Sequence, residues 1–138
     1  MNIKTAYLIL LLLLPLNSLA NGTVLNDISK LNPTEVKKVI HVTSEQQLID
    51  AVNQARNQHM TLSISGAKHS QGGQTLFPHS IHLDMLGYNK ILNLNPKDKT
   101  ITVQSGATWN YIQQNLNPHN LAIKVMQYSN IFTVGGAM

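Results

Sequence analysis

The sequence predicts an α+β fold, and three patterns carry that prediction. Apolar residues recur at helical spacing over 45–58 and 109–116, whereas residues 60–65 (MTLSIS) alternate with the period of two that is typical of a strand. The turn-forming run Pro96-Lys97-Asp98-Lys99 separates two further strand-like segments and favours an antiparallel hairpin. Because strands are expected on both sides of the first helix, the chain is predicted to contain a short βαβ unit followed by that hairpin.

The first 20 residues have the pattern of a signal peptide. Lys4 precedes an apolar run over 6–16, and the small residues Ser18 and Ala20 suit signal peptidase, so cleavage is expected before Asn21. The apolar run is too short to span a bilayer comfortably. We therefore expect an exported protein, periplasmic or secreted, with no stable membrane insertion after the leader is removed. The alternative is a chain anchored by an uncleaved N-terminal segment.

The mature chain is expected to begin with a linker. Residues 21–35 are rich in Asn, Ser and Gly, and the organised part is predicted to start with a short strand over 36–42. The motif Ser44-x-x-Gln47 is a capping box, in which the serine accepts from the amide of residue 47 and the glutamine reaches back, so a helix is predicted over 45–58. Its apolar residues at helical spacing are Leu48, Ile49, Val52 and Ala55.

Five short elements are predicted after the strand at 60–65. A strand contains Ile81, Leu83 and Met85, and the hairpin pairs 91–95 with 100–104. A second helix over 109–116 is capped by Thr108 and directs Trp109, Ile112 and Leu116 inward, and a last strand is predicted over 122–125.

Two glycine-bearing segments are the candidates for ligand binding: GAKHSQGG at 66–73 and TVGGA at 133–137. A glycine loop after a strand presents consecutive main-chain N–H groups, which can wrap a phosphate without help from lysine or arginine. Neither segment matches the phosphate loop of nucleotide triphosphatases or the GxGxxG dinucleotide fingerprint. Glycine spacing alone favours an ordinary turn over a ligand contact for each segment.

The order of five motifs changes this interpretation and favours ligand binding. The helix TSEQQLIDAVNQA, the segment TLSISGAKHSQGGQ, a short strand with Leu83-Asp84, the hairpin ending in TVQSGATW and the final TVGGA follow one another. This succession resembles the N-terminal part of the FAD-binding domain of the vanillyl-alcohol oxidase and p-cresol methylhydroxylase (PCMH) superfamily, over residues 36–138. The resemblance implies that residues 36–138 are a partial PCMH-type FAD-binding domain and that FAD is the cofactor.

The resemblance also implies roles for individual residues. The first loop would cradle the FAD pyrophosphate through backbone amides, and the second segment would pack on the same cofactor. The implied cofactor-binding residues are Gly66, Ala67, Lys68, His69, Ser70, Gln71, Thr133, Gly135 and Gly136. In many members a histidine at the position of His69 is joined covalently to the flavin, and imidazole is a suitable nucleophile near pH 7. Ser70 would bond a phosphate oxygen.

Two positions depart from the family pattern. Ser65 stands where relatives often have an arginine before the first glycine, and Lys68 stands where many have a small residue. Whether His69 is attached to the flavin or merely lies close to it is left open by the sequence. The other histidines are expected to be surface or structural residues: His41, His59, His79, His82 and His119. A metal site at His79 and His82 is disfavoured because Asp84 is the only nearby carboxylate.

Composition excludes several other functions. The absence of cysteine excludes disulfides and thiolate metal sites, and the ten basic residues are scattered apart from Lys37-Lys38, so no nucleic-acid partner is expected. No paired carboxylates, Ser-His-Asp order or HExxH motif favours a hydrolase.

The family resemblance implies more protein than this sequence holds. Relatives continue beyond the second glycine motif and add a domain that binds the substrate, a small molecule such as an alcohol, sugar or lactone. We therefore expect this chain to be a truncated portion of an exported FAD-linked oxidoreductase, inactive by itself. One alternative is a non-catalytic exported binding or interaction module that retains a remnant of the fold. Another is a relative of the cytoplasmic cell-wall reductase that shares this domain, against which the leader argues.

Overall fold

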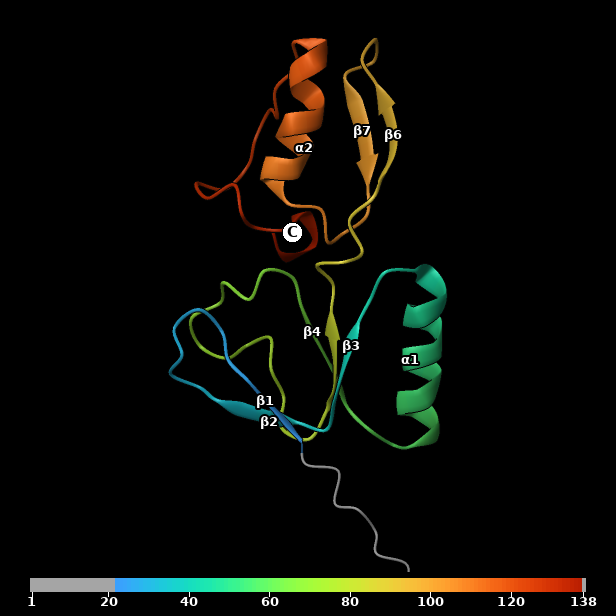
Figure 1. The fold of residues 1–138 in the computed structure, drawn as a ribbon, viewed down its shortest axis with the longest axis vertical. Helices are drawn as coiled ribbons and strands as arrows, with labels where there is room; N and C mark the ends of the chain where they lie inside the picture. The colour runs from blue at the N-terminus through green and yellow to red at the C-terminus, as the bar shows by residue number, and fades with distance from the viewer. Residues whose placement is uncertain (1–21, 138) are drawn as a thin grey trace, which may run out of the picture.

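The computed structural model describes residues 22–137, which form seven short strands, two α-helices and two 3₁₀ turns (Figure 1). The predicted signal peptide lies outside the described residues. The elements in chain order are β1 (Thr23–Leu25), β2 (Thr34–Val36), β3 (Lys38–His41), α1 (Glu45–Asn57), β4 (Leu62–Ser65), β5 (Ile81–Asp84), β6 (Ile91–Asn95), β7 (Thr100–Val103), α2 (Trp109–Leu116), η1 (Asn117–His119) and η2 (Val134–Gly136).

In Figure 1 the chain forms a lower lobe, with β1 to β5 and α1, and an upper lobe, with β6, β7, α2 and the residues that follow them. A three-stranded parallel sheet forms the centre of the lower lobe. Its strand order is β3-β5-β4, so α1 connects the two outer strands and β5 pairs with both of them. Leu83 lies opposite Ile40 on one side and Ile64 on the other. The predicted α+β class is confirmed, and the βαβ unit has a third strand inserted between its two strands.

Helix α1 begins as the capping box predicts. Ser44 Oγ accepts the N–H of Gln47 at 3.3 Å, while Gln47 Oε1 accepts the N–H of Thr43 at 2.7 Å. Ala51 and Ala55 are the buried residues of the helix, with Leu48 packed beside them. The predicted apolar face was partly wrong, because Ile49 and Val52 are 47% and 42% exposed.

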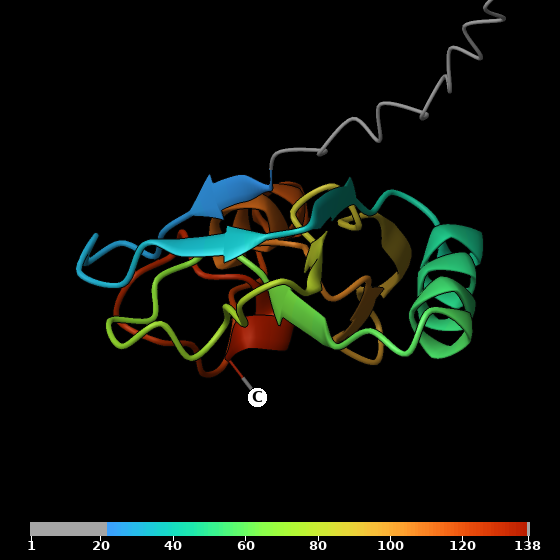
Figure 2. The same ribbon diagram turned by 90° about the horizontal axis from the view of Figure 1, so that it is seen from below.

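The apolar core has two parts, one in each lobe. In the lower lobe, α1 packs on the parallel sheet around Val42, Ala51, Ala55, Ile81, Leu83 and Met85. In the upper lobe, α2 packs on the β6–β7 hairpin around Ala107, Ile112 and Leu116. Figure 1 shows that the C-terminal segment with η2 returns to the junction of the two lobes. Figure 2, seen from below, shows α1 at one side of the molecule and the connection between β1 and β2 toward the other.

Gly106 lies between β7 and α2 of the upper lobe and packs against the segment after β5, through which the chain passes from the lower lobe to the upper lobe. A Cβ at this position would overlap the carbonyl oxygen of Met85 and lie 2.6 Å from that of Tyr88, so only glycine fits here. The N–H of Gly106 donates to the Tyr88 carbonyl at 2.7 Å. This close packing of the backbone fixes where α2 and the C-terminal segment begin relative to the lower lobe.

The structure corrects the predicted linker at 21–35. Strand β1 pairs antiparallel with β2, from Thr23↔Val36 to Leu25↔Thr34, and Asp27 between them is buried. The composition was misleading because the polar residues form side-chain hydrogen bonds that stabilise the turn, such as Ser29 Oγ to Asp27 Oδ1 at 2.5 Å.

The structure also corrects the predicted strand at 122–125, which is irregular. Its backbone bonds to a helix side chain instead of a neighbouring strand: Gln113 on α2 accepts the N–H of Ile123 at 3.1 Å and donates to the Leu121 carbonyl at 3.0 Å. Leu121 and Ile123 still pack on the upper core, which explains the apolar pattern. No helix within residues 22–137 is both long and apolar enough to cross a lipid bilayer.

Candidate functional site

The two glycine-bearing segments meet at the junction of the lobes. Loop 66–73 follows β4 in the lower lobe, and residues 133–137 end the described chain in the upper lobe (Figure 1). A Cβ on Gly66 would overlap Thr133 Oγ1 and would lie 3.1 Å from the threonine Cβ. Thr133 is only 2% exposed and forms a β-bridge with Thr108 at the start of α2. Gly66 is therefore the residue that lets the segments touch.

A cavity of about 260 Å³ opens where these segments meet. Its lining residues are Gly66, Ala67, Lys68, His69, Ser70, Thr75, Phe132, Thr133 and Gly136. A second cavity, of about 280 Å³, shares Gly66, Thr75, Thr133 and Gly136 with the first and extends to Ile64, Ser65, Met85, Ser105 and Gly135. The shared residues make the two cavities neighbours on one concave surface, which we call the junction cleft.

The structure brings most of the predicted cofactor residues to this cleft. Gln71 is the exception: it is exposed and lines neither cavity. The prediction missed Thr75, Phe132, Met85 and Ser105, which line the cleft. Phe132 stands directly before TVGGA and its aromatic ring was a usable signal, whereas Met85 and Ser105 become neighbours only through the tertiary fold.

The two segments differ in what their amides can bind. Within the described chain, the N–H groups of residues 67–71 donate to no main-chain carbonyl. In the second segment, by contrast, Val134 donates to Ala107 O at 2.9 Å and Gly135 to Ser105 O at 2.9 Å, and the next two amides close the 3₁₀ turn. The expectation that both segments present free amides was therefore wrong for 134–137. These amides hold the segment in place, and the first loop supplies the free donors.

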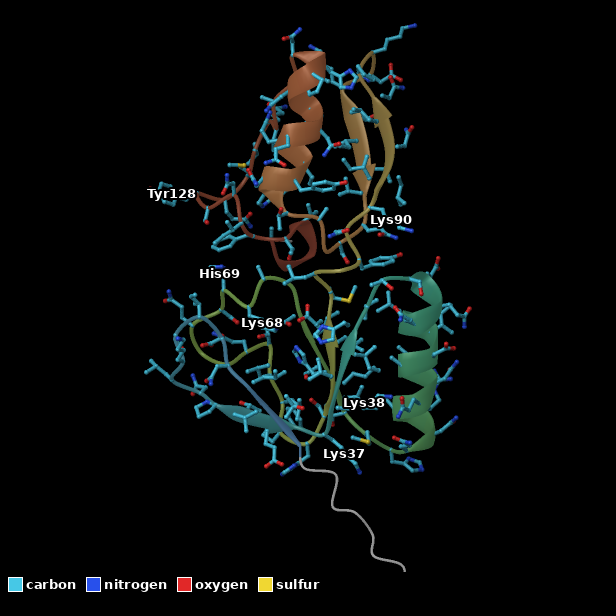
Figure 3. The ribbon with its side chains drawn as sticks, viewed as in Figure 1. Lys37, Lys38, Lys68, His69, Lys90 and Tyr128 are labelled. Atoms are coloured by element: carbon cyan, nitrogen blue, oxygen red, sulfur yellow. The ribbon has the colours of Figure 1, made fainter. Side chains whose placement is uncertain are left out.

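Lys68 is tied to the sheet beneath the loop. Its Nζ lies 2.7 Å from Asp84 Oδ2 at the end of β5, and its backbone φ is +56°. Burial by itself would raise the pKa of Asp84, but hydrogen bonds from Lys68 and from the Leu86 amide outweigh it and lower that pKa. Asp84 is therefore ionised at neutral pH and pairs with Lys68. The lysine anchors the loop instead of lying free in the cleft (Figure 3).

His69 lies at the face of the loop toward the upper lobe (Figure 3). Its ring centroid is 4.9 Å from that of Phe132, with an interplanar angle of 52°. This tilted aromatic contact joins the first loop to the residue before Thr133 and restricts the imidazole to the rim of the cleft.

His82 is a buried polar centre that the sequence did not reveal. It is fully buried on β5, its Nδ1 lies 2.8 Å from Ser63 Oγ and its Nε2 lies 2.8 Å from Ser65 Oγ. Ser63 Oγ lies in turn 2.7 Å from Ser80 Oγ. Burial, followed by the nearby charge of Lys68, lowers the pKa of His82, so the ring is neutral at pH 7. The network fixes Ser65, the last residue before Gly66, from inside the sheet.

The residues of the cleft suit a dinucleotide. A row of free amides beside a glycine is an anion-binding arrangement, and the close approach at Gly66 leaves backbone exposed where a Cβ would fill the space. Among residues 22–137, no three His, Asp or Glu side chains are grouped as a metal site would require.

A sequence profile described as "FAD binding domain" matches residues 36–138. The chain belongs to the FAD binding domain family. This confirms the family that the five motifs indicated, and FAD is its cofactor. A search of curated proteins gave no match.

Solved structures with this fold include cholesterol oxidase from Brevibacterium sterolicum, which aligns with a TM-score of 0.68 at 21% identity over 83% of this FAD binding domain chain. Alkyldihydroxyacetonephosphate synthase aligns with a TM-score of 0.64 at 17% identity over 71% of the chain. The chain spans 23% of the oxidase and 19% of the synthase. At these identities the likeness shows the fold.

The contact of Gly66 with Thr133 gives a first test. Gly66→Ala forces a methyl group against a buried threonine, so we expect the free energy of unfolding to fall by about 1–3 kcal/mol. The matched control is Gly72→Ala in the same loop, where the new Cβ meets only the flexible end of the exposed Gln74 side chain. Both variants are compared with the wild type by chemical denaturation. Gly72→Ala should change the free energy of unfolding by no more than about 0.5 kcal/mol. Equal effects of the two variants would contradict the contact.

The buried imidazole gives a test by pH. Because the pKa of His82 is lower in the folded state, the unfolded chain binds a proton first on acidification. The stabilisation from neutral His82 is thus complete above the ordinary histidine pKa and is lost as the pH falls through the lower, folded-state pKa. We expect His82→Gln to destabilise the protein by about 1–3 kcal/mol at pH 7 and to flatten this part of the stability curve. The control is His119→Gln, at an exposed position in η1. Its free energy of unfolding should change with pH as steeply as that of the wild type.

Proposed function

We propose that this chain is the FAD-binding portion of an exported FAD-linked oxidoreductase that acts on an alcohol, a sugar or lactone, or a similar small molecule. One observation carries the proposal: residues 67–70, whose amides donate to no main-chain carbonyl, line one cleft with Thr133 and Gly136, within a chain of the FAD binding domain family. The leader at 1–20 supports export to the periplasm or the medium.

Each part of the cleft has a role in this proposal. The amides of the first loop would bind the FAD pyrophosphate, with Ser70 as a further hydroxyl donor. Thr133 and Gly136 would form the opposite wall and restrict the cofactor to one orientation. When bound, FAD supplies hydride acceptance at its N5 atom, and a further acceptor such as oxygen takes the electrons. The protein's own contribution is the orientation of the cofactor.

His69 is the proposed site of covalent attachment. Its imidazole is held at the cleft rim by Phe132 and lies in the loop that would carry the pyrophosphate. An imidazole nitrogen would form a C–N bond to the 8α-methyl carbon of the flavin with loss of one methyl and one ring proton. The electron pair of the broken methyl C–H bond would stay on the flavin and reduce it, and oxygen would then take up both electrons.

We further propose that this chain is incomplete as an enzyme. A cofactor as large as FAD needs contacts from several elements to offset its immobilisation, and the junction cleft is open and small. An apolar groove of about 580 Å³ runs between β7, α2 and residues 121–124, and Ile64 is 55% exposed on β4. Such faces are typical of a domain whose remaining part covers them. That part would also carry the substrate site.

Mass spectrometry of the exported protein tests the proposal. The coding sequence that follows residue 138 should continue the domain, and its uninterrupted product should carry one acid-stable flavin on the peptide with His69 and start at Asn21. His69→Ala should abolish the acid-stable flavin, and the exposed His119→Ala should retain it.

Two results would contradict parts of this account. A longer product that neither binds flavin nor oxidises small molecules would favour a non-catalytic exported module. A stoichiometric acid-stable flavin on the 138-residue chain by itself would show that the chain needs no further part to hold FAD.

A further inference from the structure

The N-terminal hairpin loop reaches the cofactor loop, although it precedes the residues that match the family. Residues 26–33 join β1 to β2, whereas the family match begins at residue 36. Two hydrogen bonds link residues 26–33 to the loop at 66–73. The N–H of Ile28 donates to the Lys68 carbonyl at 2.9 Å, and the N–H of Gly73 donates to Asp27 Oδ2 at 2.8 Å. Figure 1 shows the same neighbours, with the β1–β2 connection beside the loop after β4.

Asp27 is built as a fixed acceptor. It is 4% exposed, and its Oδ1 accepts the N–H of Ser29 at 3.0 Å and the Ser29 hydroxyl at 2.5 Å, which leaves Oδ2 for Gly73. A buried carboxylate is retained only when its oxygens are hydrogen-bonded. The Ser29 hydroxyl first, and then the Gly73 amide, lower the pKa of Asp27, so it is ionised at neutral pH.

The two bonds hold the two unusual backbone positions of the loop. Within residues 66–76, Lys68 (φ +56°) and Gly73 (φ +70°) are the ones with a left-handed backbone. A lysine persists in this region only where its surroundings hold it there. The carbonyl of Lys68 and the amide of Gly73 are the groups that the N-terminal connection binds. The residues between these positions, including His69 and Ser70, are therefore held on both sides by a segment that precedes the family domain.

We propose that Asp27 is a positioning residue of the cofactor site: through Gly73 it fixes the loop conformation in which residues 67–71 present their amides. This inference rests on the proposed function. Asp84 anchors the same loop from the sheet through the Lys68 side chain, so Asp27 and Asp84 hold it from two sides. The loop then needs no rearrangement when a dinucleotide binds, which increases affinity by preorganisation.

The test compares Asp27→Asn with Asp98→Asn in the purified chain. Asp98 is the matched control because it also accepts hydrogen bonds, from Asn95 Nδ2 at 2.7 Å, but in the exposed β6–β7 turn. Hydrogen exchange is measured by mass spectrometry on peptides covering 66–76, with peptides covering β5 as the report on global opening. FAD affinity is measured by fluorescence titration of the same proteins.

We expect Asp27→Asn to raise exchange in 66–76 at least about ten-fold at the hydrogen-bonded amides of Gly73 and Leu76, while exchange in β5 stays unchanged, and to weaken FAD binding by about ten-fold or more. Asp98→Asn should change neither. A purely structural role would raise exchange in β5 and in the loop alike, and that result would overturn the proposal, as would unchanged exchange in 66–76. If the 138-residue wild type binds no FAD even at millimolar concentration, the affinity is measured on the longer uninterrupted product, whose failure to bind FAD would overturn the proposed function. The exchange data on the 138-residue chain decide separately whether Asp27 holds the loop.

Discussion

The approach of Gly66 to Thr133 is the constraint on which the site depends. Gly66 belongs to the lower lobe and Thr133 to the upper lobe, and the two lobes have separate cores. Because there is no Cβ at 66, the end of β4 can lie against the bridge between Thr133 and Thr108. The cleft forms at that contact, and every feature assigned to the cofactor is arranged around it. Gly106 makes the contact possible by bringing the upper lobe close to Met85 and Tyr88.

The charges around the cleft indicate how it recognises an anion. Lys68 is the one lysine or arginine among the described residues that line it, and its ammonium is paired with Asp84. His82 beneath the loop is neutral because it is buried between two serine hydroxyls. Recognition is therefore left to oriented amides, which are fixed in place and carry no net charge. The ion pair and the buried network contribute by keeping that orientation.

The sequence predicted the local elements well and the long-range arrangement poorly. Capping at Ser44 and Thr108 and the turn at 96–99 are local chemistry, so both helices and the hairpin were found within a residue or two. The ordered β1–β2 hairpin was missed because Asp27 is stabilised by Gly73, far along the chain. The hydrogen bonds of His82 were not predicted because its partners, Ser63 and Ser65, lie on another strand. The family motifs located the cleft. Only the hydrogen bonds of the structure show that the amides of 67–71 are free and that those of 134–137 already donate to main-chain carbonyls.

The most direct test of the shared cleft is an NMR titration of the ¹⁵N-labelled chain with FAD. The account predicts that amide signals from residues 67–71 and from Thr133 to Gly136 shift together along one saturation curve, while signals from the β6–β7 hairpin stay in place. Shifts confined to one of the two segments, or separate curves for each, would contradict a single dinucleotide site between the lobes.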